Sequence, residues 1–120
     1  MSGTAEGGRS IAAYVRKKGV GHYEYYQLVE NRRVEGKPRQ KVLVHLGRHP
    51  TVDDALKKWP REIRRLRRRA QKDRDSVPEG SESMPVYRDI LKRAASSEMR
   101  ADHLETNLKK LRKLRKQGGM

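Results

Sequence analysis

Hydrophobic and polar side chains alternate most regularly between residues 22 and 46, where β-branched and aromatic residues are also concentrated. An alternation with a period of two is typical of strands that bury one face. Gly36 lies near the middle of this stretch and marks a turn, so we expect a β-hairpin. Its strands should cover residues 22–33 and 39–46, joined by a loop over residues 34–38.

A further strand is expected over residues 11–16, where Ala12 and Ala13 lie between Ile11 and the pair Tyr14 and Val15. The basic stretch that follows, residues 17–21, contains two glycines and should turn the chain back toward the hairpin. The sequence therefore predicts a three-stranded antiparallel sheet.

The length of the hairpin loop decides which side chains share a face. If the loop has three residues and contains glycine, the two residue numbers of each directly facing pair add up to an even number. A two-residue turn would shift this pairing. The three-residue loop assigns one face, expected to be the core face, to Tyr26, Leu28, Glu30, Gln40, Val42, Val44 and Leu46. It assigns the open face to Tyr23, Tyr25, Gln27, Val29, Asn31, Arg33, Arg39, Lys41, Leu43 and His45.

After Pro50 the hydrophobic period changes to that of an α-helix. Thr51 is expected to cap its N-terminus, with Asp54 in the capping-box position. Pro60 interrupts the pattern, so both a kink and a break followed by a second helix are open. The hydrophobic stripe consists of Val52, Ala55, Leu56, Trp59, Ile63, Leu66 and Ala70.

Residues 73–84 are acidic and polar and contain Pro and Gly, which predicts a linker. A long helix should follow over residues 85–116, because hydrophobic and small residues recur there at alternating spacings of three and four. This seam can pack against the first helix or against a second copy of the chain. The seam consists of Tyr87, Ile90, Ala94, Ser97, Ala101, Leu104, Leu108 and Leu111, and a homodimer would form through Leu104, Leu108 and Leu111.

These elements predict an α+β protein in which a three-stranded antiparallel sheet packs on a basic helix and a long C-terminal helix follows. The expected organisation is a disordered N-terminus over residues 1–10 and a sheet-plus-helix, nucleic-acid-binding domain over residues 11–72. The acidic linker over residues 73–84 then leads to a basic C-terminal helix and tail over residues 85–120.

The charge of the chain narrows the choice of partner. Charged residues make up 38% of the sequence, and the formal net charge is +15. A field of this strength favours a polyanion. No apolar run reaches membrane-spanning length and the N-terminus lacks the order of a signal peptide, so we expect no membrane partner and a cytoplasmic, nucleoid-associated location. The absence of cysteine excludes disulfides and thiolate metal sites, and no cofactor is expected.

Two groups of residues are candidates for contact with nucleic acid. On the open face of the sheet, cations would contact phosphate, amides and guanidinium groups would contact base edges, and aromatic rings would stack. On the first helix, arginines outside the hydrophobic stripe would lie along a phosphate backbone. The candidate residues are Tyr23, Tyr25, Gln27, Asn31, Arg33, Arg39, Lys41, His45, Arg61, Arg64, Arg65, Arg68 and Arg69.

Catalysis finds little support in the sequence. His45 and His49 are four residues apart, but Gly47 and Pro50 prevent a shared helical face, and no cysteine or carboxylate completes a metal set. Nothing around the five tyrosines supplies the rest of an active site. We therefore expect a protein that is not an enzyme.

Residues 25–33, 35–43 and 46–48 read YYQLVENRR, EGKPRQKVL and LGR. This stretch resembles the extreme N-terminal region of a group of insertion-sequence DDE transposases, which open with a strand, a Gly-Lys turn and a second strand that ends in Leu-Gly. The resemblance covers residues 23–48 and implies a DNA-associated hairpin of mobile-element origin. The acidic catalytic residues of that group lie in a much longer domain, so catalysis is not implied.

The expected function is noncatalytic binding of nucleic acid, with double-stranded DNA preferred and a transposase-related origin. Two alternatives remain at this stage. One is an RNA-binding or ribosome-associated basic protein. The other is a coiled-coil module that binds a protein partner through its last helix.

Overall fold

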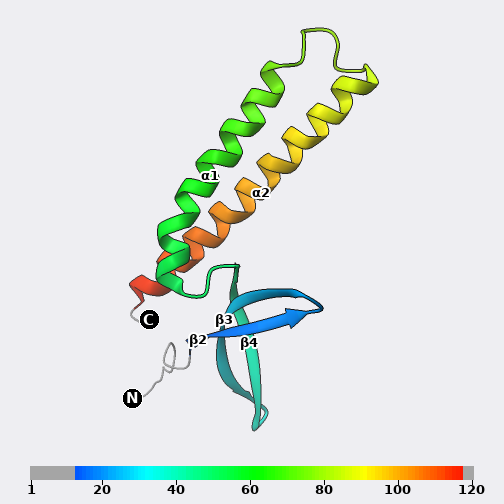
Figure 1. The fold of residues 1–120 in the computed structure, drawn as a ribbon. Helices are drawn as coiled ribbons and strands as arrows, with labels where there is room; N and C mark the ends of the chain where they lie inside the picture. Colours follow the sequence, from blue (N-terminus) through cyan, green and yellow to red (C-terminus); the bar gives the residue numbers. More distant parts are fainter. Residues whose placement is uncertain (1–12, 118–120) are drawn as a thin grey trace. The chain divides into compact units, whose positions relative to one another are not determined.

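The structure, a computed structural model, describes residues 13–117 with the exception of the Val34 side chain. The segment 1–10 that is expected to be disordered lies outside the described residues, as do the first two residues of the expected first strand. A three-stranded antiparallel sheet is followed by two helices (Figure 1), which confirms the α+β prediction. The elements are β2 (Ala13–Val20), β3 (Tyr23–Val34), β4 (Lys37–Gly47), α1 (Val52–Asp75) and α2 (Pro85–Lys116).

The chain folds into two compact units. The sheet unit contains the described residues up to Lys57 together with those from Asn107 onward, and the helical unit contains Lys58–Thr106. The domain limits expected from the sequence remain a prediction. Within the described part of the chain, neither helix is long and apolar enough to cross a bilayer.

β2 and β3 form a hairpin with an unbroken register, from Ala13 opposite Glu30 to Val20 opposite Tyr23. The turn contains only Gly21 and His22, and Gly21 supplies the positive φ (61°) that a two-residue hairpin turn needs at its first position. The expected turn over residues 17–21 is therefore wrong for residues 17–20, which continue the strand. One glycine at the right position is enough to reverse the chain.

β3 and β4 are also joined by a two-residue turn, formed by Glu35 and Gly36. Both have positive φ, 54° and 77°, which is the backbone pattern of a type I′ turn. The expected loop over residues 34–38 is therefore too long, because Val34 pairs with Lys37 and Arg33 with Pro38. The shorter turn moves the register of the neighbouring residues by one.

Two register shifts in β3–β4, between Leu28 and Val29 and between Tyr26 and Gln27, change the pairing further along the hairpin. Leu28 faces Val44, as the three-residue loop would place it. Nearer the turn the expected faces are wrong: Gln40 and Val42 lie opposite Asn31 and Val29, while Arg39 and Lys41 lie opposite Arg32 and Glu30.

The core of the sheet unit contains buried residues from strands and from helix ends. Leu28, Val29, Val44 and Leu46 are buried on the strands, Ala55 in the first turn of α1, and Leu108 and Leu111 near the end of α2. Thr51 caps α1 as expected, since its Oγ1 accepts a hydrogen bond from the Asp54 amide at 3.0 Å. Asp54 Oδ2 also contacts Nδ1 of the buried His49 at 3.1 Å.

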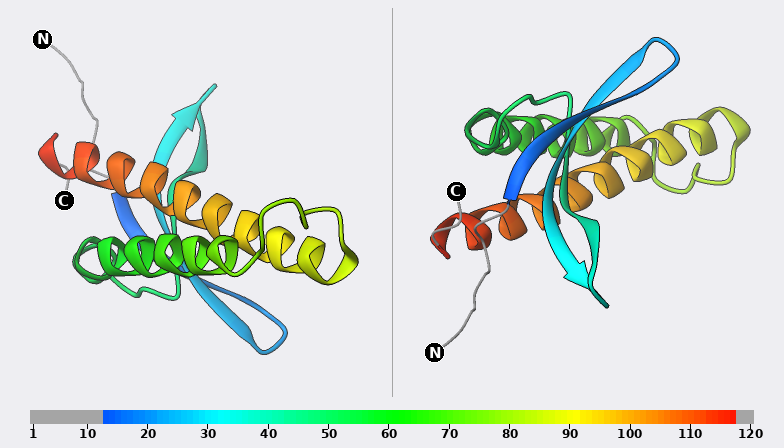
Figure 2. Two further views of the ribbon diagram at one scale, coloured as in Figure 1. Left: turned by 90° about the horizontal axis from the view of Figure 1, so that it is seen from above. Right: turned by 90° about the horizontal axis from the view of Figure 1, so that it is seen from below.

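In the helical unit, α1 and α2 lie side by side and antiparallel (Figure 2). Pro60 lies inside an unbroken α1, so the sequence alternative of a break at this residue does not occur. The expected stripe of α1 is buried at Trp59, Ile63, Leu66 and Ala70, and the seam of α2 is buried at Ala94, Ser97 and Ala101. Homodimerisation stays a prediction, and it would have to use a seam whose Leu108 and Leu111 are already buried within one chain.

Candidate nucleic-acid interface

A polar cluster lies on the face of the sheet that carries the side chains of Tyr14, Arg16, Gln27, Asn31, Gln40 and His45, and we call it the open-face cluster. Arg16 is at its centre: Nη2 donates to Gln27 Oε1 at 2.8 Å, and Nη1 donates to Gln40 Oε1. Gln40 Nε2 in turn donates to the Tyr14 hydroxyl at 2.6 Å. The two glutamine amides are thus fixed by an arginine that the sequence reading did not include.

Gln27 and Val29 differ from their expected exposure. Both were expected on an open face, but Gln27 is 6% exposed and Val29 is fully buried. The Gln27 amide already contacts Arg16 and, at 3.3 Å, His45 Nδ1. Gln27 therefore positions its neighbours and has little surface left for a ligand, whereas His45 and Asn31 remain exposed.

Asn31 keeps more hydrogen-bonding capacity than the glutamines. Among the described residues, its one hydrogen bond is a long contact of 3.5 Å from the Tyr14 hydroxyl to Oδ1. Arg16 Nε is buried and has no hydrogen-bond partner in the described part of the chain, which is a cost of about 1–3 kcal/mol. The side-chain amides of Gln27 and Gln40 are therefore fixed by hydrogen bonds, whereas the Asn31 amide is available to a ligand.

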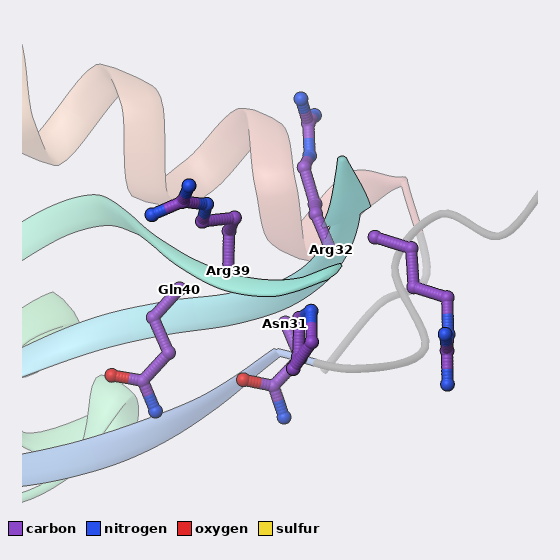
Figure 3. Close-up of a pocket in the computed structure, with 6 residues that line it drawn as sticks. Asn31, Arg32, Arg39 and Gln40 are labelled. Atoms are coloured by element: carbon purple, nitrogen blue, oxygen red, sulfur yellow. The ribbon is translucent and has the colours of Figure 1, made fainter. Parts of the chain in front are cut away.

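The β3–β4 tip, residues 30–41, is the most basic part of the sheet. A hollow of about 370 Å³ there is lined by Asn31, Arg32, Arg33, Pro38, Arg39 and Gln40. Figure 3 shows Arg32 and Arg39 extending to one side of the hairpin and Asn31 and Gln40 to the other. The predicted site residues are therefore divided: Asn31 and Arg33 lie on one face, and Arg39 and Lys41 on the opposite one.

Most cations of this tip lack an acidic partner. Arg32 pairs with Glu30 at 2.5 Å, and Arg33 donates to the Gly36 carbonyl at 3.2 Å. Lys37, Arg39 and Lys41 are exposed and form no ion pair among the described residues. Arg32 and Arg39 also face each other directly across the strands, an arrangement of like charges that destabilises a sheet. An anion bound here would relieve that repulsion.

The predicted aromatic residues lie at the other end of β3. Tyr23 is 64% exposed and Tyr25 is half-buried, and their rings stack with centroids 6.0 Å apart. Figure 2 shows the two hairpin ends of the sheet projecting in opposite directions. Tyr23 and Tyr25 therefore do not join Arg33, Arg39 and Lys41 in a single patch.

The arginines of α1 that were predicted to contact nucleic acid are exposed. Arg67 and Arg74, which were not among the predicted residues, form ion pairs with α2. Arg67 contacts Asp102 at 3.0 Å and Glu105 at 2.9 Å, and the hydrogen bond that Arg67 donates to Asp102 is the main reason that the pKa of Arg67 is raised. Arg74 pairs with Glu98, which raises the pKa of Arg74. The exposed predicted arginines are Arg61, Arg64, Arg65, Arg68 and Arg69.

One further arginine joins this basic surface. Arg65 and Arg69 of α1 and Arg100 of α2 line a hollow of about 70 Å³, together with Glu62, Leu66 and Leu104. Arg100 is far from the basic run in sequence, and only the antiparallel packing brings it close. Besides Arg100, sequence reasoning missed Tyr14, Arg16 and Gln40; the alternation of polar residues in the first strand was the available signal for Arg16.

A comparison with protein-family models decides the family. Residues 13–82, more than half of the chain, match the model of the IS1634 family transposase, N-terminal domain. The chain belongs to this family. The resemblance inferred from residues 23–48 is confirmed, and the match is wider, since it also includes β2, α1 and most of the following loop.

All thirteen predicted site residues lie within the matched region of this IS1634-type N-terminal domain, whereas α2 begins after it. No curated protein and no solved structure matches the chain. Within residues 13–117, no group of three or more His, Asp or Glu side chains is placed to hold a metal ion.

Proposed function

We propose that this transposase-related domain binds duplex DNA without catalysing a reaction on it. The observation that carries the proposal is the excess of cations at the β3–β4 tip: Lys37, Arg39 and Lys41 have no ion pair among the described residues, and Arg39 faces Arg32, which is paired with Glu30. Like charges held opposite each other cost stability in the free protein. A phosphate between them would turn this cost into a favourable interaction.

The hairpin supplies two different surfaces at this tip. The face with Arg32, Arg39 and Lys41 suits phosphate, because each cation placed on a phosphate releases condensed counterions. The face with Asn31 suits base edges, since an asparagine amide can pair with adenine in the major groove. We assign phosphate contact to the first face and base contact to the second.

The shape of the element favours DNA over RNA. The B-DNA major groove is about 12 Å wide and admits a two-stranded β-ribbon, whereas the A-form major groove is too narrow for side chains to read. A hairpin closed by a two-residue turn is such a ribbon. The exposed arginines of α1 would add phosphate contacts that do not depend on sequence.

Binding of the full chain to labelled duplex DNA, followed by fluorescence anisotropy at 50 and 200 mM salt, tests the proposal. We expect affinity to fall steeply with salt and unlabelled duplex DNA to compete better than structured RNA or single strands. Binding that is absent, independent of salt or displaced best by RNA would contradict it. A random duplex pool is the suitable first probe, and sequencing of the bound fraction would then reveal any preferred bases.

The noncatalytic part of the proposal needs its own measurement. Most side chains in the open-face cluster and at the β3–β4 tip are amides, hydroxyls and cations, which suit binding, and of the two carboxylates at the tip Glu30 is paired with Arg32. We expect supercoiled plasmid DNA incubated with the protein and Mg²⁺ or Mn²⁺ to remain intact on a gel. Nicking or strand transfer above the level of a mock-purified control would show that the domain is an enzyme.

A further inference from the structure

The β2–β3 tip, residues 17–25, exposes hydrophobic side chains where the β3–β4 tip exposes cations. Val20 is 66% exposed and Tyr23 is 64% exposed. They face each other directly in the last pair before the turn, so their side chains lie on the same face of the hairpin. A single exposed hydrophobic residue needs no explanation, but here two adjoining ones form the end of a projecting hairpin.

This exposed pair is rigidly supported. The Tyr23 ring stacks against Tyr25, with 6.0 Å between centroids and 29° between the planes. The turn beyond it has two residues, and Gly21 adopts the positive φ that keeps the turn tight. The side chains of Val20 and Tyr23 are therefore presented on a narrow, ordered end.

The charges around the tip are complementary to a polyanion. Lys18 faces Tyr25 across the strands and has no ion pair among the described residues, while Lys17 is neutralised by Glu24 at 3.3 Å. Two side chains cannot supply the roughly 800 Å² that each partner buries in a stable protein interface. They are sufficient, however, to wedge into a base step.

We propose that the β2–β3 tip inserts Val20 and Tyr23 between stacked base pairs of duplex DNA and locally unstacks them. This inference rests on the proposed function and adds a second, sequence-sensitive contact to it. Insertion of hydrophobic side chains kinks the duplex, and flexible pyrimidine–purine steps unstack at the lowest cost. The phosphate contacts of the β3–β4 tip hold the DNA while the opposite end of β3 deforms it.

The test uses duplexes that carry 2-aminopurine at successive TA and CA steps, since the fluorescence of this base rises when it is unstacked. The full chain is expected to raise the fluorescence at one or more of these steps. The double variant Val20→Ser with Tyr23→Ser is expected to abolish the rise and to lower affinity about tenfold, in line with the loss of one stacking contact. Tyr23→Phe keeps the ring and should retain the signal.

A matched control is available on α2, where Val86 and Met99 are similarly exposed, at 60% and 72%. Val86→Ser with Met99→Ser removes the same kind of surface and should leave both fluorescence and affinity unchanged. Circular dichroism melting of both double variants shows whether either one has lost its fold. Val20→Ser alone provides a second, milder variant if the double variant melts early, and it should reduce the fluorescence rise.

The outcomes separate this inference from the proposed function. Salt-dependent binding of the unmodified chain without a fluorescence rise at any step would overturn the insertion and leave DNA binding intact. A rise that survives in the tip variant would also overturn it. No binding in the parallel anisotropy measurement would overturn both proposals. A tip variant that changes only the mass in solution would identify the tip as a contact between copies of the chain and overturn the insertion.

Discussion

The helical unit and the β3–β4 tip both carry several cations, but three arginines of the helical unit are paired with acids on the facing helix, whereas most cations of the tip have no acidic partner among the described residues. Arg67, Arg74 and Arg93 each reach a carboxylate on the facing helix, at distances of 2.5–3.0 Å. At the tip, Lys37 and Arg39 have no acidic partner among the described residues, and Arg39 faces another arginine. The same residue types therefore hold the two helices together in one region and remain available to a ligand in the other.

This difference teaches that net charge alone does not locate a binding surface. The 30 lysines and arginines include arginines whose charge is already offset by acids within the fold. Removal of three cations from either region changes the net charge equally. Paired variants can therefore separate a local interface from a general attraction between opposite charges.

The largest effect is expected from Lys37→Gln, Arg39→Gln and Lys41→Gln combined, which neutralises the tip. Three lost phosphate contacts should lower the affinity for duplex DNA roughly 100-fold near 0.1 M salt and flatten the salt slope by about 2.7. All three side chains are exposed, so the melting temperature should hardly change. Anisotropy titrations at several salt concentrations measure both quantities.

The control for this variant is Arg67→Gln, Arg74→Gln and Arg93→Gln, which removes the same amount of charge from the helical unit. If the two triple variants lost affinity to the same extent, net charge would explain binding and the tip would not be an interface.

The second prediction concerns the stability of that control variant. Without the three arginines, Asp73, Glu98 and Asp102 would lose the cations with which they form ion pairs between the two helices. We expect the melting temperature to fall by several degrees, while DNA affinity falls much less than in the Lys37→Gln, Arg39→Gln, Lys41→Gln variant. Thermal melting followed by circular dichroism provides the measurement. An unchanged melting temperature would show that these ion pairs do not hold the helices together.

The third prediction tests the turn that positions the tip. Gly36 has a φ of 77°, and a Cβ added there would meet no atom within 4 Å. Gly36→Ala should therefore cost about 1 kcal/mol through backbone strain alone. Gly36→Asn should cost less, because asparagine tolerates the left-handed region. Urea unfolding of the unmodified protein, Gly36→Ala and Gly36→Asn measures these differences in stability. Equal stability of all three would contradict the strain argument.

This turn also marks the limit of what the sequence could predict. The capping of α1 by Thr51, the buried stripe of α1 and the α+β class followed from local chemistry and hydrophobic period. The turn did not, because Glu35 adopts a positive φ that its residue type disfavours. One residue of error in the turn exchanged the faces of Gln40 and Arg39, and the register shift between Val29 and Leu28 restored the pairing at Leu28.

The candidate site was predictable in part for the same reason. Exposed arginines on α1 follow from helical geometry, so Arg64 and Arg68 lie where they were expected. The open-face cluster depends on pairing between strands, and Arg16 joins Gln27 and Gln40 only because two registers bring three strands together. Such contacts are set by tertiary structure and leave no local pattern in the chain.

The smallest effect is expected from acid, through the same ion pairs of the helical unit. Hydrogen bonds from Arg93 and Arg74 lower the pKa values of Asp73 and Glu98 below their usual values. A carboxylate whose pKa is lowered by folding contributes stability above its unfolded pKa, near 4, and loses it as the pH falls through the folded pKa. The melting temperature should therefore be level between pH 7 and 5 and decline below about pH 4.

Comparison with the Arg67→Gln, Arg74→Gln, Arg93→Gln variant assigns this decline to the ion pairs. That variant has lost Arg93 and Arg74, the main causes of the two lowered pKa values, so its melting temperature should vary less between pH 5 and 3. The contribution is small because the cations that lower these pKa values are partly exposed, Arg74 at 41% and Arg93 at 62%, so that solvent screens both ion pairs. An equally steep decline in both proteins would place the acid sensitivity in other carboxylates. The paired charges of the helical unit would then contribute no more to stability than the cations of the β3–β4 tip.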